Sequence, residues 1–134
     1  MIKVQIIDNT AQIKPALFAV GIDVNLQEDE VGALNTIEKQ QPSVVLLNYA
    51  VRKEHTAEYI KLILDSSKTS KVVIVANALS EKQILNCLTA GAKGYQEISQ
   101  LETYVNKLVK VIDAGEAWIT RRMVAVLLDS LIKK

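Results

Sequence analysis

The segment that decides the fold is Pro42-Ser43-Val44-Val45-Leu46-Leu47-Asn48, in which an apolar run ends at a single polar side chain. A second continuous apolar run, Val72-Val73-Ile74-Val75, follows later in the chain. Runs without polar alternation are typical of parallel strands that are covered on both faces. We therefore predict five strands, at residues 2–7, 23–26, 43–47, 71–76 and 94–95.

Six amphipathic stretches, which lie between or after these strands, carry apolar residues at helical spacing. Their apolar residues are Leu17 and Val20; Val31, Leu34 and Ile37; Ile60, Ile63 and Leu64; Ile84, Leu85 and Leu88; Leu101, Val105, Leu108, Val109 and Ile112; and Val124, Leu127, Leu128, Leu131 and Ile132. Gly91 and Gly115 are placed to end the fourth and fifth helices, and Thr120 to cap the sixth. The alternation predicts an α/β, doubly wound sheet of five parallel strands, with helices on both faces and an extra C-terminal helix.

Composition narrows the class of protein. The chain has 134 residues, which suits one domain, and 49% of them are hydrophobic. A formal net charge of +1 and only 4% aromatic residues argue against a surface built to grip nucleic acid. One cysteine and one histidine exclude a disulfide framework and make a zinc site improbable. We find neither a signal peptide nor an apolar run of about 18 residues, and so expect a cytoplasmic protein without a membrane span.

Four segments carry a resemblance to a known family. Ile6-Ile7-Asp8-Asn9 resembles the first-strand acidic pair of response-regulator receiver domains, and the 42–48 segment resembles their phospho-acceptor strand. Ala90-Gly91-Ala92-Lys93-Gly94-Tyr95 is similar to the segment that enters their fifth strand. Gly115-Glu116-Ala117-Trp118-Ile119-Thr120-Arg121 resembles the linker of LuxR-type (NarL-type) regulators.

This resemblance implies a flavodoxin-like strand order of 2-1-3-4-5, with the site at the carboxyl ends of the strands. It also implies a receiver-like domain over residues 1–114. Residues 115–134 are then a linker and sixth helix that lead to a DNA-binding domain absent from this chain.

The family's chemistry combines two acids and an acceptor aspartate that hold Mg²⁺, with a Ser or Thr and a Lys that bind the phosphoryl group. By the resemblance, these five positions fall on Asp8, Asn9, Asn48, Ala76 and Ile98. Four of the five are replaced, and each replacement removes a charge or a hydrogen-bonding group that the chemistry needs. We therefore expect a pseudo-receiver that is no enzyme, has no cofactor, binds Mg²⁺ weakly or not at all, and does not become phosphorylated.

Two further residues of this region have open interpretations. Asp8 either touches a cation or, as we prefer, is hydrogen-bonded to Asn9, Asn48 or a loop amide, which would lock the site in one state. Tyr95 falls where receivers often carry a switch-like aromatic residue. It either turns toward the site or packs on its neighbours at the strand edge.

The linker has a ligand-binding interpretation as well. Trp118-Ile119-Thr120-Arg121 resembles a motif with which one branch of biofilm regulators binds cyclic di-GMP, and there Trp118, Thr120 and Arg121 would contact the nucleotide. A helix N-terminus also favours phosphate. The same spacing is ordinary in linkers that bind no nucleotide. A different ligand site, for an uncharged molecule, would be a pocket walled by Asn48, Ala76, Tyr95 and Ile98.

The sixth helix needs a partner for its apolar residues. We predict a homodimer in which Val124, Leu127, Leu128 and Leu131 form the seam, and the alternative is that the helix docks on its own domain. The preferred function is a phosphorylation-independent regulatory and dimerisation module of a transcriptional regulator. DNA would be contacted only through the absent domain, and a protein partner or small ligand could provide control. A cyclic di-GMP-type sensor is the alternative, and a phosphorylated two-component receiver the least favoured function.

Overall fold

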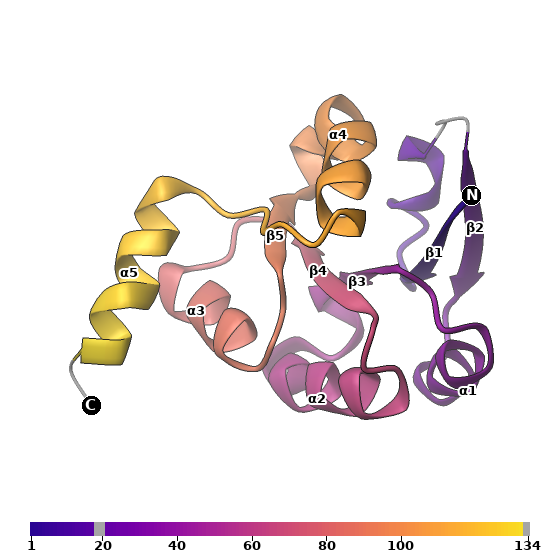
Figure 1. Ribbon diagram of the computed structural model, residues 1–134, viewed down its shortest axis with the longest axis horizontal. Helices are drawn as coiled ribbons and strands as arrows, with labels where there is room; N and C mark the ends of the chain where they lie inside the picture. Colours follow the sequence, from indigo (N-terminus) through magenta and orange to yellow (C-terminus); the bar gives the residue numbers. More distant parts are fainter. Residues whose placement is uncertain (18–20, 133–134) are drawn as a thin grey trace.

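The computed structural model describes residues 1–17 and 21–132, and these form one five-stranded parallel sheet (Figure 1). The strand order is β2-β1-β3-β4-β5, as the resemblance implied. The strands are β1 (Ile2–Ile7), β2 (Ile22–Gln27), β3 (Val44–Asn48), β4 (Lys71–Ala76) and β5 (Gly94–Glu97). The two continuous apolar runs form the central strands β3 and β4, whose apolar side chains are all buried.

The α-helices of the described chain are α1 (Glu30–Gln40), α2 (Thr56–Ser66), α3 (Glu81–Thr89), α4 (Leu101–Asp113) and α5 (Arg121–Ile132). Gly91 ends α3 as predicted, with φ +118° and hydrogen bonds from the Gly91 and Ala92 amides back to Leu88 and Cys87. Gly115 ends α4 in the same way. Thr120 caps α5, because its hydroxyl accepts a hydrogen bond from the Met123 amide at 3.1 Å.

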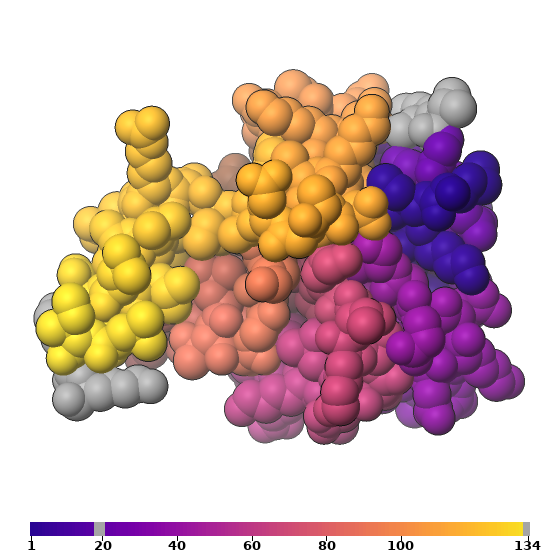
Figure 2. Space-filling model, in the orientation of Figure 1, coloured from indigo at the N-terminus to yellow at the C-terminus, as the bar shows by residue number. Residues whose placement is uncertain are grey.

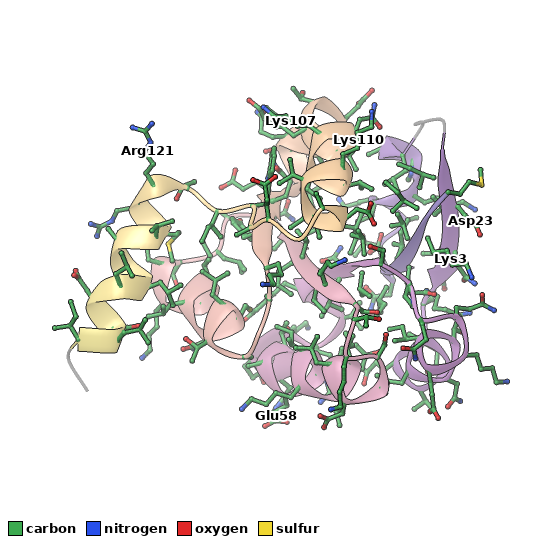
Figure 3. All side chains as sticks on the ribbon, in the orientation of Figure 1. Lys3, Asp23, Glu58, Lys107, Lys110 and Arg121 are labelled. Carbon is green, nitrogen blue, oxygen red and sulfur yellow. The ribbon has the colours of Figure 1, made fainter. Side chains whose placement is uncertain are left out.

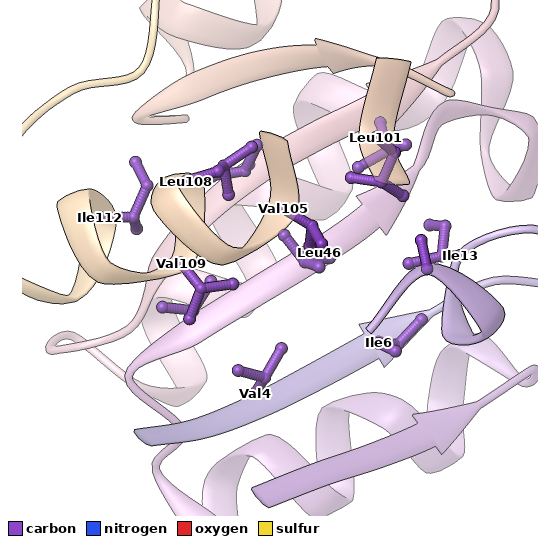
Figure 4. Packing of buried hydrophobic residues seen from close by; sticks show 13 residues of the cluster. Val4, Ile6, Ile13, Leu46, Leu101, Val105, Leu108, Val109 and Ile112 are labelled. Atoms are coloured by element: carbon purple, nitrogen blue, oxygen red, sulfur yellow. The ribbon is translucent and has the colours of Figure 1, made fainter. Parts of the chain in front are cut away.

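Helices cover both faces of the sheet. On one face α4 lays its apolar side over β1 and β3, so that Leu101, Val105, Leu108, Val109 and Ile112 meet Val4, Ile6 and Leu46 (Figure 4). On the other face α1, α2 and α3 cover the remaining side chains of the same strands through Ile37, Ile60, Ile63 and Cys87. The alternation along each strand thus supplies two separate cores.

The first predicted helix is wrong for the residues that the structure describes. Between β1 and β2 the chain forms only a short 3-10 turn, Lys14–Ala16, and Leu17 is extended, while Val20 lies outside the described residues. The amides of Thr10, Gln12 and Ile13 all donate to the Asp8 side chain, which fixes this loop against the end of β1, and its buried residues are Ile13 and Ala16.

One predicted helix face needs correction, and one gains a residue. Val31 lies in the first turn of α1 and is 66% exposed, because the buried side of that helix is formed by Ala33 and Ile37. In α5 the buried residue is Met123, where the helix contacts α3, and Val124, Leu128 and Leu131 point away from the domain.

The segment between α4 and α5 is attached to the outer edge of β5. Trp118 forms a parallel bridge with Gly94: its amide donates to the Lys93 carbonyl at 2.9 Å, and its carbonyl accepts from the Tyr95 amide at 3.0 Å. A Cβ atom on Gly94 would lie 2.5 Å from the Trp118 carbonyl oxygen. Glycine is therefore required at position 94 for this close approach.

The candidate site at the carboxyl ends of the strands

Asp8 and Asn48 lie side by side at the carboxyl ends of β1 and β3, and both are buried, at 1% and 2% exposed. The Asn48 side-chain amide donates to Asp8 Oδ1 at 2.9 Å. Asn48 is the last residue of β3, and its Oδ1 accepts from the Ala50 amide at 2.9 Å, which starts the next turn. Asn48 therefore uses both ends of its amide group to hold neighbouring loops.

The Asp8 carboxylate accepts five hydrogen bonds in all. Oδ1 accepts from the Thr10 amide (2.9 Å), the Thr10 hydroxyl (2.6 Å) and Asn48, and Oδ2 accepts from the Gln12 and Ile13 amides (3.1 Å each). A carboxylate has about four lone-pair sites. Its acceptor capacity is therefore filled by the protein itself, which agrees with the expectation of a carboxylate held by Asn48 and loop amides.

These hydrogen bonds also control the ionisation of Asp8. Burial on its own raises the pKa of this carboxyl group, but the hydrogen bonds from Thr10, Ile13 and Asn48 outweigh burial and lower the pKa below its ordinary value. The carboxylate is therefore charged at neutral pH, and its charge is stabilised by the hydrogen-bond donors around it.

Thr10 is a member of this cluster that the sequence interpretation missed. Its hydroxyl donates to Asp8 and accepts from Asn48 at 3.1 Å, so it links the two side chains. The signal was available: an aspartate commonly accepts from the backbone amide two residues further on, and that amide belongs to Thr10. Asn9, which the sequence paired with Asp8, is instead exposed.

The other two positions of the resemblance lie at the same edge of the sheet. Ala76 ends β4, is 3% exposed and pairs in register with Glu97, the last residue of β5. Ile98 follows as the first residue of a 3-10 turn and packs against the core below α4. Neither side chain can bind a phosphoryl oxygen. Among the described residues, no group of three or more acidic, histidine or cysteine side chains could hold a metal ion.

An ion pair lies on the other side of Asn48. Arg52, in the turn after β3, donates to Glu30 at the start of α1 (Nη1 to Oε2, 2.6 Å), and its guanidinium lies 5.5 Å from the centre of the Tyr59 ring. The Tyr59 hydroxyl donates to the Glu30 carbonyl at 2.7 Å. Burial raises the pKa of Tyr59, so the phenol stays protonated as a donor. This cluster fastens α1 to the loop after Asn48.

Tyr95 is half-buried, and its hydroxyl accepts from the Leu79 amide at 3.3 Å, in the loop that leads into α3. Of the residues predicted to wall a pocket for an uncharged ligand, Asn48 and Ala76 are almost fully buried. Tyr95 lines instead an open groove of about 470 Å³ over β5.

We call this the aromatic groove. It lies between the start of α4 and the segment that leads into α5, and its walls include Tyr95, Glu97, Gln100, Tyr104, Trp118 and Thr120. The Trp118 ring is half-buried, its indole N–H donates to Gln96 Oε1 at 3.0 Å, and its centre lies 6.3 Å from that of Tyr104. Gln96 and Tyr104 were absent from the sequence interpretation, because only the bridge between Trp118 and Gly94 brings them beside the linker.

The three linker residues proposed for a nucleotide are separated by the structure. Trp118 and Thr120 line the aromatic groove, whereas Arg121 is exposed and projects away from the domain at the start of α5 (Figure 3). The next residue, Arg122, donates to Glu81 of α3 through two hydrogen bonds of 2.8 and 3.0 Å. This ion pair and buried Met123 attach α5 to its own domain.

The outer side of α5 carries most of the predicted seam. Leu127 is half-buried, but Val124, Leu128 and Leu131 are 39%, 54% and 58% exposed. Figure 2 shows α5 (yellow) standing out from one side of the domain. None of the described helices is long and apolar enough to cross a membrane.

Comparison with known proteins identifies the fold. No protein-family model matches the chain, and no curated protein matches it. Among solved structures, the isolated REC domain of RcsB from Salmonella enterica serovar Typhimurium, in the apo form, superposes with a TM-score of 0.82 at 16% identity, over 96% of this chain and 99% of that one.

Two LuxR-family proteins are also similar. A two-component response regulator from Aurantimonas sp. SI85-9A1 gives a TM-score of 0.79 at 15% identity, over 97% of each chain. A DNA-binding response regulator from Silicibacter pomeroyi gives 0.71 at 20% identity, over 91% of this chain and 99% of that one. The chain therefore has the receiver-domain fold of response regulators, including the C-terminal helix.

Proposed function

We propose that this chain is a pseudo-receiver, a regulatory and dimerisation module of a LuxR-type transcriptional regulator that works without an aspartyl phosphate. The observation that carries this proposal is the filled carboxylate of Asp8, which accepts five hydrogen bonds, one of them from Asn48 at the former acceptor position. We further propose that the protein is no enzyme, needs no metal or other cofactor, and acts in the cytoplasm.

The chemical reasons are local. Mg²⁺ takes oxygen ligands at short range and prefers carboxylates, yet both oxygens of Asp8 are occupied, and Asn9 and Asn48 contribute no charge. A cation that binds Asp8 must displace protein donors from the oxygen that it takes: Thr10 and Asn48 from Oδ1, or the amides of Gln12 and Ile13 from Oδ2. The carboxamide of Asn48 is also a poor nucleophile, and its nitrogen already donates to Asp8 and Thr10.

Labelling with acetyl phosphate and Mg²⁺, read by intact-protein mass, tests the proposal. We expect no phosphorylated species. A variant that restores the four replaced groups (Asn9→Asp, Asn48→Asp, Ala76→Thr, Ile98→Lys) controls for the reagent, and the single variant Asn48→Asp should label far less than this control. Stoichiometric labelling of the natural chain would refute phosphorylation independence.

The dimerisation role is supported by the outer side of α5. An exposed apolar stripe of this kind marks an association surface, and a helix of this length gains little stability without a partner. A second copy of α5 offers the same apolar stripe, so Leu128 and Leu131 of two chains can cover one another. Contact with DNA would belong to a further domain of the regulator.

Sedimentation velocity over a concentration series tests this role. We expect a dimer for the natural chain and a monomer of unchanged helix content for Leu128→Glu with Leu131→Glu. Leu62→Glu, which alters an exposed leucine on α2 (46% exposed), is the matched control and should leave the dimer intact. A natural chain that stays monomeric at all concentrations contradicts the dimerisation role.

A cyclic di-GMP sensor remains the second candidate, since Trp118 and Thr120 line an open groove. Two features weigh against it: Arg121 points away, and the groove contains the carboxylate of Glu97. A repeat of the sedimentation series with the nucleotide separates the candidates. A chain that dimerises only with the nucleotide would move this function to first place, and Arg121→Ala should then abolish the response.

A further inference from the structure

The aromatic groove has a chemical character that neither the receiver fold nor the nucleotide hypothesis requires. Three of the six aromatic residues of the chain, Tyr95, Tyr104 and Trp118, line it. Tyr104 is 43% exposed, so its ring is accessible to a ligand. Aromatic faces attract cations, and a planar guanidinium stacks on them particularly well.

The aromatic groove carries a negative charge, which is opposite to that of a guanidinium. Among the residues that the structure describes, Glu97 is the only charged one that lines the aromatic groove. Glu97 is exposed, and within residues 1–17 and 21–132 it forms no ion pair, whereas the nearby Arg122 is engaged by Glu81. The start of α5 contributes an opposing dipole of about half a positive charge. One of its amides is already capped by Thr120, and the full charge of Glu97 outweighs the remainder.

A second, smaller groove of about 230 Å³ continues from the first. The two share Tyr95, Glu97, Ile119 and Thr120. The second is also lined by the apolar side chains of Leu79, Ile84 and Met123 and by Glu81 and Arg122, which form an ion pair with each other. The combined surface thus offers an aromatic and anionic compartment beside one that combines apolar side chains with the ion pair of Glu81 and Arg122. Two different adjacent compartments suit a peptide better than a small ion.

We propose that the aromatic groove binds an arginine side chain of a partner protein, with an aliphatic neighbour of that arginine seated between Leu79 and Met123. Glu97 accepts hydrogen bonds from the guanidinium, and the exposed ring of Tyr104 contacts one of its faces. This inference is independent of phosphorylation and of dimerisation through α5.

The fluorescence of Trp118, the only tryptophan of the chain, reports directly on this groove. We would titrate the full chain with the capped dipeptide leucyl-arginine and with its counterpart in which neutral citrulline replaces arginine. Because exposed ion pairs contribute up to about 1 kcal/mol, the arginine peptide should bind about fivefold more tightly. Glu97→Gln should remove this preference, and Glu102→Gln, an exposed carboxylate on α4 outside the groove, should keep it.

Three results would overturn the proposal: no response to the arginine peptide, equal binding of the two peptides, or an unchanged preference in Glu97→Gln. Cyclic di-GMP is the third probe. If the nucleotide alone titrates Trp118, and binds more tightly to Glu97→Gln, the groove is an anion site and the arginine proposal fails. Far-ultraviolet circular dichroism of each variant establishes that the change lies in binding and not in folding.

Discussion

Two carboxylates at the carboxyl ends of the strands have opposite surroundings. Asp8, after β1, is 1% exposed and accepts five hydrogen bonds from its own loop and Asn48. Glu97, at the end of β5, is exposed and lines an open groove. The carboxylate of Asp8 is fully hydrogen-bonded within the fold, whereas the carboxylate of Glu97 is accessible to a ligand. Hydrogen-bond saturation therefore separates the two proposed roles: the carboxylate of Asp8 has no free acceptor, and the carboxylate of Glu97 is accessible.

The largest effect is expected for Asp8→Ala. Removal of the carboxylate leaves the amides of Gln12 and Ile13 and the side chain of Asn48 without their acceptor in a buried place. Lost charge-assisted hydrogen bonds and unpaired donors should lower the free energy of unfolding by roughly 3–5 kcal/mol. Urea denaturation measures this loss. Asn9→Ala, at the exposed neighbour, should change it by less than about 0.5 kcal/mol. Equal effects of the two changes would mean that Asp8 is not an anchor.

Gly94→Ala should have the next largest effect on stability, and it tests the region around β5 and the aromatic groove. The added Cβ would lie 2.5 Å from the Trp118 carbonyl oxygen and 2.8 Å from its Cβ, so the backbone bridge must open or shift. We expect a loss of about 1–3 kcal/mol and a red shift of tryptophan emission as the indole is exposed. Gly21→Ala is the control: φ is +89° there, but the added atom meets nothing within 4 Å. Gly21→Ala should destabilise the chain without shifting the wavelength of tryptophan emission.

The dependence of stability on pH is a further test of the role of Asp8. The pKa of Asp8 is lowered from 3.8, because its hydrogen bonds outweigh burial. The unfolded chain therefore binds this proton more tightly than the folded one. The resulting stability is fully present above the ordinary pKa of an aspartate in the unfolded chain. It is lost as the pH falls through the lower pKa that Asp8 has in the folded protein. Urea denaturation from about pH 5 to pH 2 should show this loss, and Asp8→Asn should remove that part of the pH dependence.

The smallest effect is expected for Arg122→Gln. Its partner Glu81 is exposed, so the pair is screened by water and contributes little to global stability. The pair lowers the pKa of Glu81 all the same. We expect faster amide hydrogen exchange in α5 with an unchanged unfolding midpoint. Arg121→Gln, which removes a charge that projects into solvent, should leave the exchange rates as they are.

Most of the fold could be predicted from local patterns. Continuous apolar runs identified β3 and β4, and Gly91 and Gly115 marked the ends of α3 and α4. The failure between β1 and β2 has a physical cause. Leu17 and Val20 are spaced as on a helix, but the loop is held against the end of β1 by Asp8, and Ile13 and Ala16 supply its buried side chains. Helical periodicity does not reveal either feature.

The candidate site could likewise be predicted from the sequence only in part. The contact of Asp8 with Asn48 follows from the resemblance, because both lie at the ends of neighbouring strands. The aromatic groove could not be predicted, because Glu97 and Tyr104 belong to β5 and α4 and meet Trp118 only through the backbone bridge at Gly94. That bridge forms because Gly94 has no side chain, and a glycine does not stand out among candidate functional residues in a sequence.

The same bridge has a consequence for solubility. An edge strand with unpaired backbone groups is a template for intermolecular pairing and aggregation. Trp118 occupies the Lys93 carbonyl and the Tyr95 amide on the outer edge of β5, so the chain blocks that template with its own backbone. A polypeptide shortened after Ala114 would expose these groups together with the apolar base of the groove. The smallest form of this domain that stays dispersed in solution should therefore extend through Trp118.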